Sequence, residues 1–474
     1  MVLYKAAYYE GTDVEEKEPI TKHNAEEPIN KGEAKSTDFQ ALVNIIKANI
    51  GSGILTMPFA YKNGGVILGT IALVTVALIT MHCITLLVKC KKKLVRDLKA
   101  RKREQGEDFD ENEIVTYGDV GKETMGKFGT AFISTLLVFT QTGFCCAYLN
   151  FIGGNMHEMV PALREWHYII ISLVVLIPIC LIRNLKHLSL LSIISEILML
   201  AGMGIVIYFD IFTLSTTSFP GDRRISTFDF KNFPVFFGIC IFGFEGIGLA
   251  LPVESNMKNK KHFKAVLYTA ESLVGIMMGV FGLFGYIAFA HNVQSMITLN
   301  IPSGSSLGIV IKVGFIIALA FTYPMQLFPV SELFDGYLDV VIEKFKRKPS
   351  GDESQFLFNP TTNSLEVQTK TSRKATLLRW IAGSVMRAVV IILTAVLAAS
   401  IPDFGSFLSL IGGLGGTLLA FVLPCIIHII VYRKEMHWYV FAKDISIATF
   451  GILASAITTW TAIDNMIKGR KGGH

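Results

Sequence analysis

The chain has 474 residues, of which 51% are hydrophobic and only 17% are charged. Soluble domains average about 25% charged residues, and here the charges gather in residues 1–38, 89–127 and 343–379 with long apolar stretches between them. This pattern excludes one large water-soluble core and predicts membrane spans with polar connections. The formal net charge of +6 then reflects membrane topology rather than nucleic-acid binding.

The apolar stretches predict an all-α integral membrane protein. A bilayer core of about 30 Å needs about 20 apolar residues in a helix. We expect a cytoplasmic N-terminal tail over 1–38, a transporter domain over 39–467, cytoplasmic loops near 89–127 and 343–379, and a C-terminal tail over 468–474. The eleven predicted spans are 39–60, 65–89, 128–156, 167–183, 188–213, 232–253, 265–290, 306–330, 380–400, 404–430 and 439–463.

The distribution of Lys and Arg predicts the orientation of these spans. Cytoplasmic loops carry an excess of Lys and Arg. With the N-terminus in the cytoplasm, about 32 of the 44 Lys and Arg residues fall in inside segments and about 8 in outside segments. The exception is the basic C-terminal tail, which an odd number of spans places outside.

The first and sixth predicted spans are interrupted by similar motifs. Each holds a Gly-x-Gly near its middle with a Pro a few residues later, Gly51-Ser52-Gly53 before Pro58 and Gly246-Ile247-Gly248 before Pro252. Gly and Pro both disfavour a continuous helix, and broken backbone inside a bilayer is tolerated only where it is buried in protein or lines a cavity. Paired breaks in corresponding spans point to a transporter site. Their separation by five spans predicts a five-plus-five inverted repeat, with the eleventh helix outside it.

These breaks suit a zwitterionic solute. Half-helix N-termini offer N–H groups to a carboxylate, and freed carbonyls suit an ammonium group. The alternative is that Gly-x-Gly only permits close helix packing. Polar residues of the third span and Tyr323 of the eighth are added as hydrogen-bond candidates, with interhelical bonding as their alternative. The predicted substrate-binding residues are Asn49, Ile50, Gly51, Ser52, Gly53, Thr140, Gln141, Phe242, Gly243, Phe244, Glu245, Gly246 and Tyr323.

Glu245 in the sixth-span break is the predicted proton-coupling residue or partner of the substrate ammonium, because intramembrane acids commonly mark transport pathways and proton relays. The alternative is a buried acid satisfied by Lys47, Lys312 or Arg387. Lys312, Arg387, Glu196 and Glu271 are expected in helix–helix pairs or as snorkelling groups, and His82 as a packing residue. No metal cluster, cofactor motif, catalytic triad or ATPase domain stands out.

Several of these segments resemble the proton-coupled amino acid transporters of the amino acid/auxin permease superfamily. The resemblance is carried by 47–58, 139–146, 183–185, 242–252 and 297–302. It implies eleven spans and symport of protons with small neutral amino acids such as alanine, glycine and proline. It also implies a plasma-membrane or lysosomal–endosomal location. Asn44, which cannot titrate, stands where several members hold a proton-coupling histidine, and no cysteine is available for the disulfide that better-studied members form between outside loops.

The leading hypothesis is therefore a secondary active transporter, a proton symporter of small neutral amino acids that works by alternating access. One alternative is a proton-independent facilitator, which Asn44 favours. Another is an amino-acid-sensing transceptor that signals to cytosolic partners. A channel is less favoured because no charged ring or filter loop is visible, and an enzyme is least favoured.

Overall fold

The computed structural model describes residues 36–106, 114–182, 185–216, 225–244, 246–302, 304–346, 357–359, 364–366, 373–401 and 403–472. Several predicted segments lie wholly or partly outside these residues. They include the N-terminal tail up to residue 35, parts of the predicted cytoplasmic loops 89–127 and 343–379, Arg183 with Asn184, Glu245, and the last two residues of the C-terminal tail.

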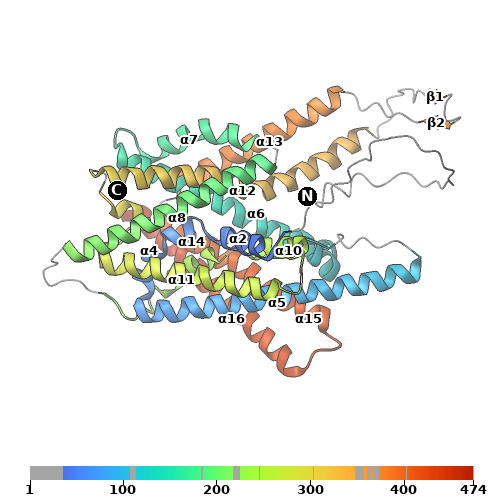
Figure 1. Ribbon diagram of the computed structural model, residues 1–474, viewed down its shortest axis with the longest axis horizontal. Coiled ribbons are helices and arrows are strands. Elements are labelled where there is room, and N and C mark those ends of the chain that lie inside the picture. Colours follow the sequence, from blue (N-terminus) through green and yellow to red (C-terminus); the bar gives the residue numbers. More distant parts are fainter. Residues whose placement is uncertain are drawn as a thin grey trace.

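The described chain is a bundle of helices that run mainly along one axis (Figure 1). The first part contains α2 (Asp38–Asn49), α3 (Ser52–Leu55), α4 (Met57–Gly64), α5 (Val66–Gln105), α6 (Tyr117–Met159), α7 (Glu165–Cys180) and α8 (Leu185–Thr216). The second part contains α9 (Phe233–Gly243), α10 (Ile247–Asn256), α11 (Phe263–Phe289), η1 (Ala290–Asn292), η2 (Ile297–Asn300), α12 (Ser306–Lys346), α13 (Arg373–Ala399), α14 (Phe404–Ile411), η3 (Gly412–Gly416), η4 (Leu418–Val422), α15 (Leu423–Tyr432) and α16 (Trp438–Gly472).

Nine helical segments among the described residues are long and apolar enough to cross a membrane. They coincide with nine of the eleven predicted spans. The other two predicted spans have a different form: the first consists of the short helices α2, α3 and α4, and the fourth is the 16-residue helix α7. The all-helical membrane architecture is thus confirmed, while a total of eleven crossings stays a prediction.

The predicted polar connections contain more regular structure than their composition indicates. Helix α5 continues to Gln105, and α6 begins at Tyr117 behind a capping box in which Thr116 and Asp119 satisfy each other's backbone N–H groups. Between α12 and α13, strands β1 (Leu357–Asn359) and β2 (Ser364–Glu366) form an antiparallel hairpin. Charged residues make these segments polar without preventing them from extending the helices.

The sixth predicted span, α9 with α10, lies at the centre of the bundle, whereas α16 lies at its edge. In the most apolar window of each, 82% of residues are buried in the span Phe233–Asn256 but only 22% in Trp438–Lys468. Large apolar side chains on α16 face outward, including Trp460, which is 76% exposed. Such a surface suits lipid, and the central position of α9 and α10 places their interruption inside the protein.

The glycine cluster of the tenth predicted span forms the π-helical turn η3, which packs against three helices. A Cβ on Gly412 would lie 2.1 Å from the carbonyl oxygen of Gly238 on α9. Cβ atoms on Gly413 and Gly415 would lie 2.3 Å from side-chain atoms of α16 and α6, respectively. The glycines therefore allow close helix packing, and η3 supports α9 just before its break.

The two ends of the bundle can be told apart in Figure 1. The β1–β2 hairpin lies at one end, and the C-terminus lies at the other. Three predicted spans lie between the hairpin and the C-terminus in the sequence. An odd number of crossings places two points at opposite ends of the bundle, as the structure does. Ser36 forms a β-bridge with Met257 directly after α10, so the start of the first broken helix and the end of the second lie side by side.

Candidate functional site

The first interruption separates α2 from α4 by a single short helix. After Asn49 the backbone extends through Ile50 (φ −86°, ψ 111°) and Gly51 (φ −161°, ψ −156°) before α3 begins. No described backbone hydrogen bond is donated by the N–H groups of Gly51 and Ser52. The Ser52 hydroxyl is fully buried and has no hydrogen-bond partner among the described residues. The break thus gathers polar groups that can bind a ligand.

Pro58 lies in the first turn of α4 rather than inside a continuous helix. Pro is favoured there because its missing N–H is one of those that a helix start leaves unsatisfied. The proline of the first motif therefore helps to start the next helical segment.

The second interruption lies between α9 and α10. Helix α9 ends at Gly243, Phe244 caps it, and α10 resumes at Ile247. The N–H of Gly246 would continue the helix by donating to the carbonyl of Phe242, but it donates instead to Asn49 Oδ1 over 3.1 Å. This leaves the Phe242 carbonyl without its helical donor. Glu245, the predicted proton-coupling residue, lies outside the described residues.

The two interruptions face each other. A Cβ on Gly53 would lie 3.1 Å from the Cα of Gly243 and 3.0 Å from the ring of Phe242. The glycine of the first break therefore allows its backbone to approach that of α9. Gly53 does permit close helix packing, which was the alternative to a binding site. The same packing brings the backbone groups of both breaks together.

Asn49 links these breaks to a third helix. Its Nδ2 donates to the carbonyl of Ile45 over 2.9 Å and to Oε1 of Glu271 on α11 over 3.2 Å, while its Oδ1 accepts from Gly246. Asn49 was predicted as a site residue, whereas Glu271 was expected only in helix packing. The structure brings both to the same junction.

Aromatic rings of α6 lie beside the breaks. The Phe144 ring lies 4.3 Å from that of Phe242 and 6.5 Å from that of Tyr148, measured between centroids. The Tyr148 hydroxyl would lie 2.9 Å from a Cβ on Gly51, and it accepts a hydrogen bond from Gln326 Nε2 over 3.4 Å. Neither aromatic residue of α6 was among the predicted site residues, although both follow the predicted Gln141 at helical spacings of three and seven.

The remaining predicted residues have different environments. Thr140 donates to the carbonyl of Leu137 in its own helix. Gln141 has a buried Oε1 without a partner among the described residues. The Tyr323 hydroxyl shares a 2.7 Å hydrogen bond with Thr394 of α13, which is the interhelical bonding foreseen as its alternative.

Most interior charges have partners. Lys312 pairs with Glu158, and Arg387 pairs with Asp335 over 2.8 Å. Their predicted role in helix–helix pairing is confirmed. Lys47 and Glu196 attract each other across α2 and α8.

His82 on α5 is the predicted packing histidine, and it has a specific partner. Its Nε2 lies 2.6 Å from Lys443 Nζ on α16. Lys443 also pairs with Asp444, and Asp444 is bound to His428 of α15. This network joins α5, α15 and α16.

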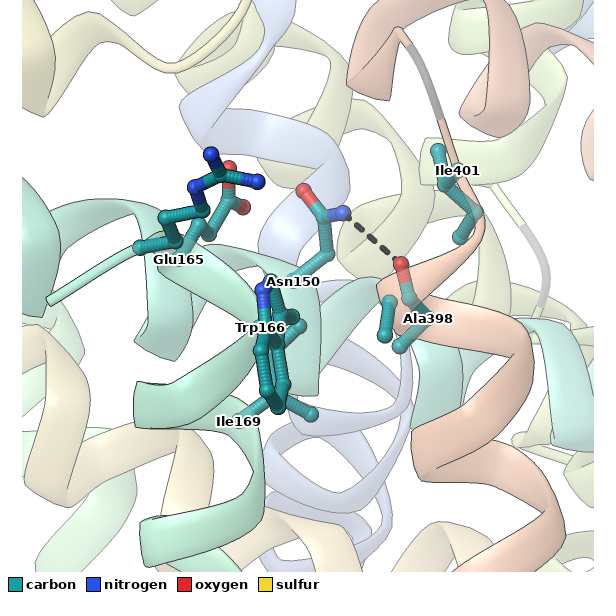
Figure 2. Close-up of a pocket in the computed structure, with 8 residues that line it drawn as sticks. Asn150, Glu165, Trp166, Ile169, Ala398 and Ile401 are labelled. Atoms are coloured by element: carbon teal, nitrogen blue, oxygen red, sulfur yellow. Dashed lines mark hydrogen bonds between the residues drawn. The ribbon is translucent and has the colours of Figure 1, made fainter.

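A separate pocket of about 230 Å³ lies between α6, α7 and the end of α13. Figure 2 shows Asn150 on one side of it, donating to the carbonyl of Ala398, with Trp166 and Glu165 nearby. None of the residues of the two breaks lines this pocket. The candidate site therefore rests on the breaks themselves.

The sequence profile described as "Transmembrane amino acid transporter protein" matches residues 34–464. Amino acid transporter AVT3C of Arabidopsis thaliana is 27% identical over 92% of this chain and 93% of its own length. Amino acid transporter AVT3A of the same plant is 29% identical over 92% and 91%, respectively. Among solved structures, MhsT in complex with L-phenylalanine is 12% identical with a TM-score of 0.49, covering 89% of this chain and 98% of that one. The match over most of the chain shows that this protein belongs to the transmembrane amino acid transporter family, the amino acid/auxin permeases, and is a transporter rather than an enzyme.

Proposed function

We propose that the chain is a secondary active transporter of small neutral amino acids that couples their movement to protons and works by alternating access. The observation that carries this proposal is the meeting of two interrupted helices, with Gly53 against Gly243 and Asn49 against Gly246. In the proposed topology the N-terminus is cytoplasmic, eleven helices span the membrane, and spans one to five and six to ten form inverted repeats.

The polarity of the proposed site follows from the free backbone groups. The N–H groups of Gly51 and Ser52, which have no acceptor among the described residues, together with the Ser52 hydroxyl, would receive the substrate carboxylate. The carbonyl of Phe242, which has lost its helical donor to Asn49, would receive the ammonium group. A zwitterion satisfies both breaks at once.

The surroundings of the breaks favour a small side chain. Phe144, Tyr148 and Phe242 are all nearly fully buried, and their rings occupy one side of the junction. The close approach of Gly53 to Phe242 and Gly243 of α9 confines the junction further. Alanine, glycine and proline fit such a confined, largely apolar site. The resemblance to proton-coupled transporters supports a plasma-membrane or lysosomal–endosomal location.

The test is uptake of labelled alanine, glycine and proline into proteoliposomes that contain the purified protein, with and without an inwardly directed proton gradient. We expect saturable uptake that competing unlabelled substrate suppresses and that external acid increases. Protein-free liposomes are the control. Absence of uptake and of substrate exchange under every gradient would overturn the proposal.

A proton-independent facilitator is the second candidate, and Asn44 favours it. Asn44 cannot titrate, and it lies on an exposed face of α2 rather than at the junction of the breaks. This candidate predicts the same substrate uptake with no response when the proton gradient is collapsed.

A further inference from the structure

The carboxyl group of Glu271 on α11 is buried at the junction of the two broken helices. Its side chain is fully inaccessible, and one oxygen, Oε1, accepts the 3.2 Å hydrogen bond from Asn49. The other oxygen, Oε2, is buried without a hydrogen-bond partner among the described residues. Buried polar groups are normally bonded, so Oε2 of Glu271 is open to a partner that the described residues do not supply.

Asn49 connects Glu271 to both breaks. It is the last residue of α2, and it uses its amide nitrogen for Ile45 and Glu271 and its amide oxygen for Gly246. A change in the hydrogen bond between Glu271 and Asn49 therefore alters the contacts of Asn49 at the end of α2 and at the start of α10. These are the segments that would hold the substrate.

Among the described residues of neighbouring helices, no charged side chain neutralises Glu271. On α2, Lys47 is attracted to Glu196 of α8. On α5, His82 is bound to Lys443. Asp210 of α8 is a second buried acid, and neither of its oxygens has a partner among the described residues. None of these side chains forms an ion pair with Glu271.

Burying an ionised carboxylate that has one neutral hydrogen-bond donor costs free energy, so Glu271 favours a cationic partner. The described residues show no group of three acidic, His or Cys side chains that could hold a metal ion. A proton, in contrast, needs only the oxygen Oε2.

We propose that Glu271 binds the transported proton, and that Asn49 relays its protonation state to the substrate site. This assignment rests on the proposed symport. The proton comes from water on one side of the membrane, forms an O–H bond at Oε2, and returns to water on the other side when that bond breaks. The carboxylate is regenerated in each cycle, so no other reactant is needed.

Protonation changes the bond that Glu271 makes with Asn49. An ionised carboxylate accepts a charge-assisted hydrogen bond, which is about twice as strong as a neutral one. Adding the proton weakens that bond and releases Asn49 to reorient the backbone at Gly246 and at the end of α2. Because coupling is reciprocal, a proton that raises substrate affinity is itself bound more tightly when substrate is present.

The experiment compares the wild type with Glu271→Gln in proteoliposomes, using alanine as the substrate. Two measurements are made: exchange of labelled for unlabelled alanine at equal pH, and net accumulation under a one-unit inward proton gradient. A one-to-one symporter can accumulate substrate up to about tenfold under that gradient, since a tenfold ratio corresponds to about 1.4 kcal/mol. Glu271→Gln should keep exchange but lose accumulation, giving a ratio of about one. Accumulation at the wild-type level would overturn the proposal.

Asp210→Asn is the matched control, because it neutralises another buried acid without a described partner. It should accumulate alanine as the wild type does, and loss of coupling in Asp210→Asn instead of Glu271→Gln would overturn the assignment. A sodium gradient at equal pH tests the competing cation, and sodium-driven accumulation would also overturn it. Should Glu271→Gln fail to fold, Glu271→Asp keeps a titratable group at a new position, and an unchanged pH profile for it would contradict the proposal.

Exchange and accumulation measured with the wild type distinguish failure of this proposal from failure of the proposed function. Exchange without gradient-driven accumulation keeps amino acid transport and overturns the proton assignment. Neither exchange nor accumulation overturns both.

Discussion

The two broken helices carry the same order of residue types, yet they are built differently. In the first, Gly51 and Gly53 both lie between α2 and α4, and Pro58 opens the next helix. In the second, Gly246 is the one residue of the motif beside the gap, while Gly248 and Pro252 lie inside α10. The shared motif indicates that a span is interrupted, but the packing around each glycine decides where the interruption falls.

The same two helices also differ in how they are anchored at the end near Ser36. Helix α10 is held by Glu254, which is 1% exposed and pairs with Lys91 over 2.8 Å. Helix α2 is held by Asp38, which pairs with His262 over 2.6 Å, with both side chains about half exposed. A buried anchor on one broken helix and an exposed anchor on the other indicate that α2 is the more easily released of the two.

The largest expected effect comes from breaking the buried anchor. Glu254→Ala leaves Lys91 buried without its carboxylate, and removal of one partner of a buried pair costs about 3–5 kcal/mol. Asp38→Asn should cost less than about 1 kcal/mol, because water already screens that pair. Unfolding of the purified variants in detergent measures both.

Replacing the whole buried pair is the control for this result. The double variant Lys91→Met with Glu254→Leu should regain much of the lost stability, because it removes the unpaired charge. Equal losses for Glu254→Ala and Asp38→Asn would show that the two anchors do not differ as described.

An intermediate effect is expected from adding one methyl group to each motif. In Gly53→Ala the new Cβ would lie 3.0 Å from the ring of Phe242 and 3.1 Å from the backbone of Gly243. Overpacking of this kind costs about 1–3 kcal/mol, and it separates the two breaks, so initial uptake should fall by about tenfold.

Gly248→Ala is the matched control for that methyl group. Its Cβ would lie 3.3 Å from the mobile end of Leu137, and alanine favours the helix in which Gly248 lies. Uptake should remain within about twofold of the wild type, since a small repacking costs little. Similar losses in both alanine variants would mean that the two glycines serve the same purpose.

The sequence predicts the spans and their interruptions because both depend on local properties. Apolar length sets the helices, and Gly with Pro sets the breaks. Asn49 was predicted in the site, whereas Glu271 was expected in a helix–helix pair or as a snorkelling group. No local pattern could reveal its role, because the bond between Asn49 and Glu271 joins positions 222 apart in the chain and exists only once α2 and α11 are packed together.

The aromatic residues beside the breaks show the same limit. Phe144 lies in the segment 139–146 that carries the family resemblance, but neither it nor Tyr148 belongs to a Gly or Pro motif. Helix α6 is also apolar enough that any of its faces could have been buried. Tyr323 was predicted as a hydrogen-bond candidate for the substrate, yet its hydroxyl is bonded to Thr394 on α13. Which tyrosine lies beside the break is decided by how α6 and α12 are rotated, and residue type alone does not report that rotation.

The smallest expected effect distinguishes these two tyrosines. The Tyr148 hydroxyl lies next to Gly51, where the proposed substrate carboxylate binds. A hydrogen bond is worth about 0.5–1.5 kcal/mol, so Tyr148→Phe should raise the KM for alanine by about two- to tenfold. The maximal rate should change less, because the ring that packs beside Phe144 is kept.

Tyr323→Phe is the control, since it removes a hydroxyl of the same kind from a site of helix packing. It should lower the stability of the protein by about 0.5–1.5 kcal/mol through the lost bond to Thr394, and it should leave the KM unchanged. A raised KM in Tyr323→Phe together with a normal KM in Tyr148→Phe would move the substrate away from the first break and toward the interface of α12 and α13. The two measurements thus test, residue against residue, whether the site lies where the broken helices meet.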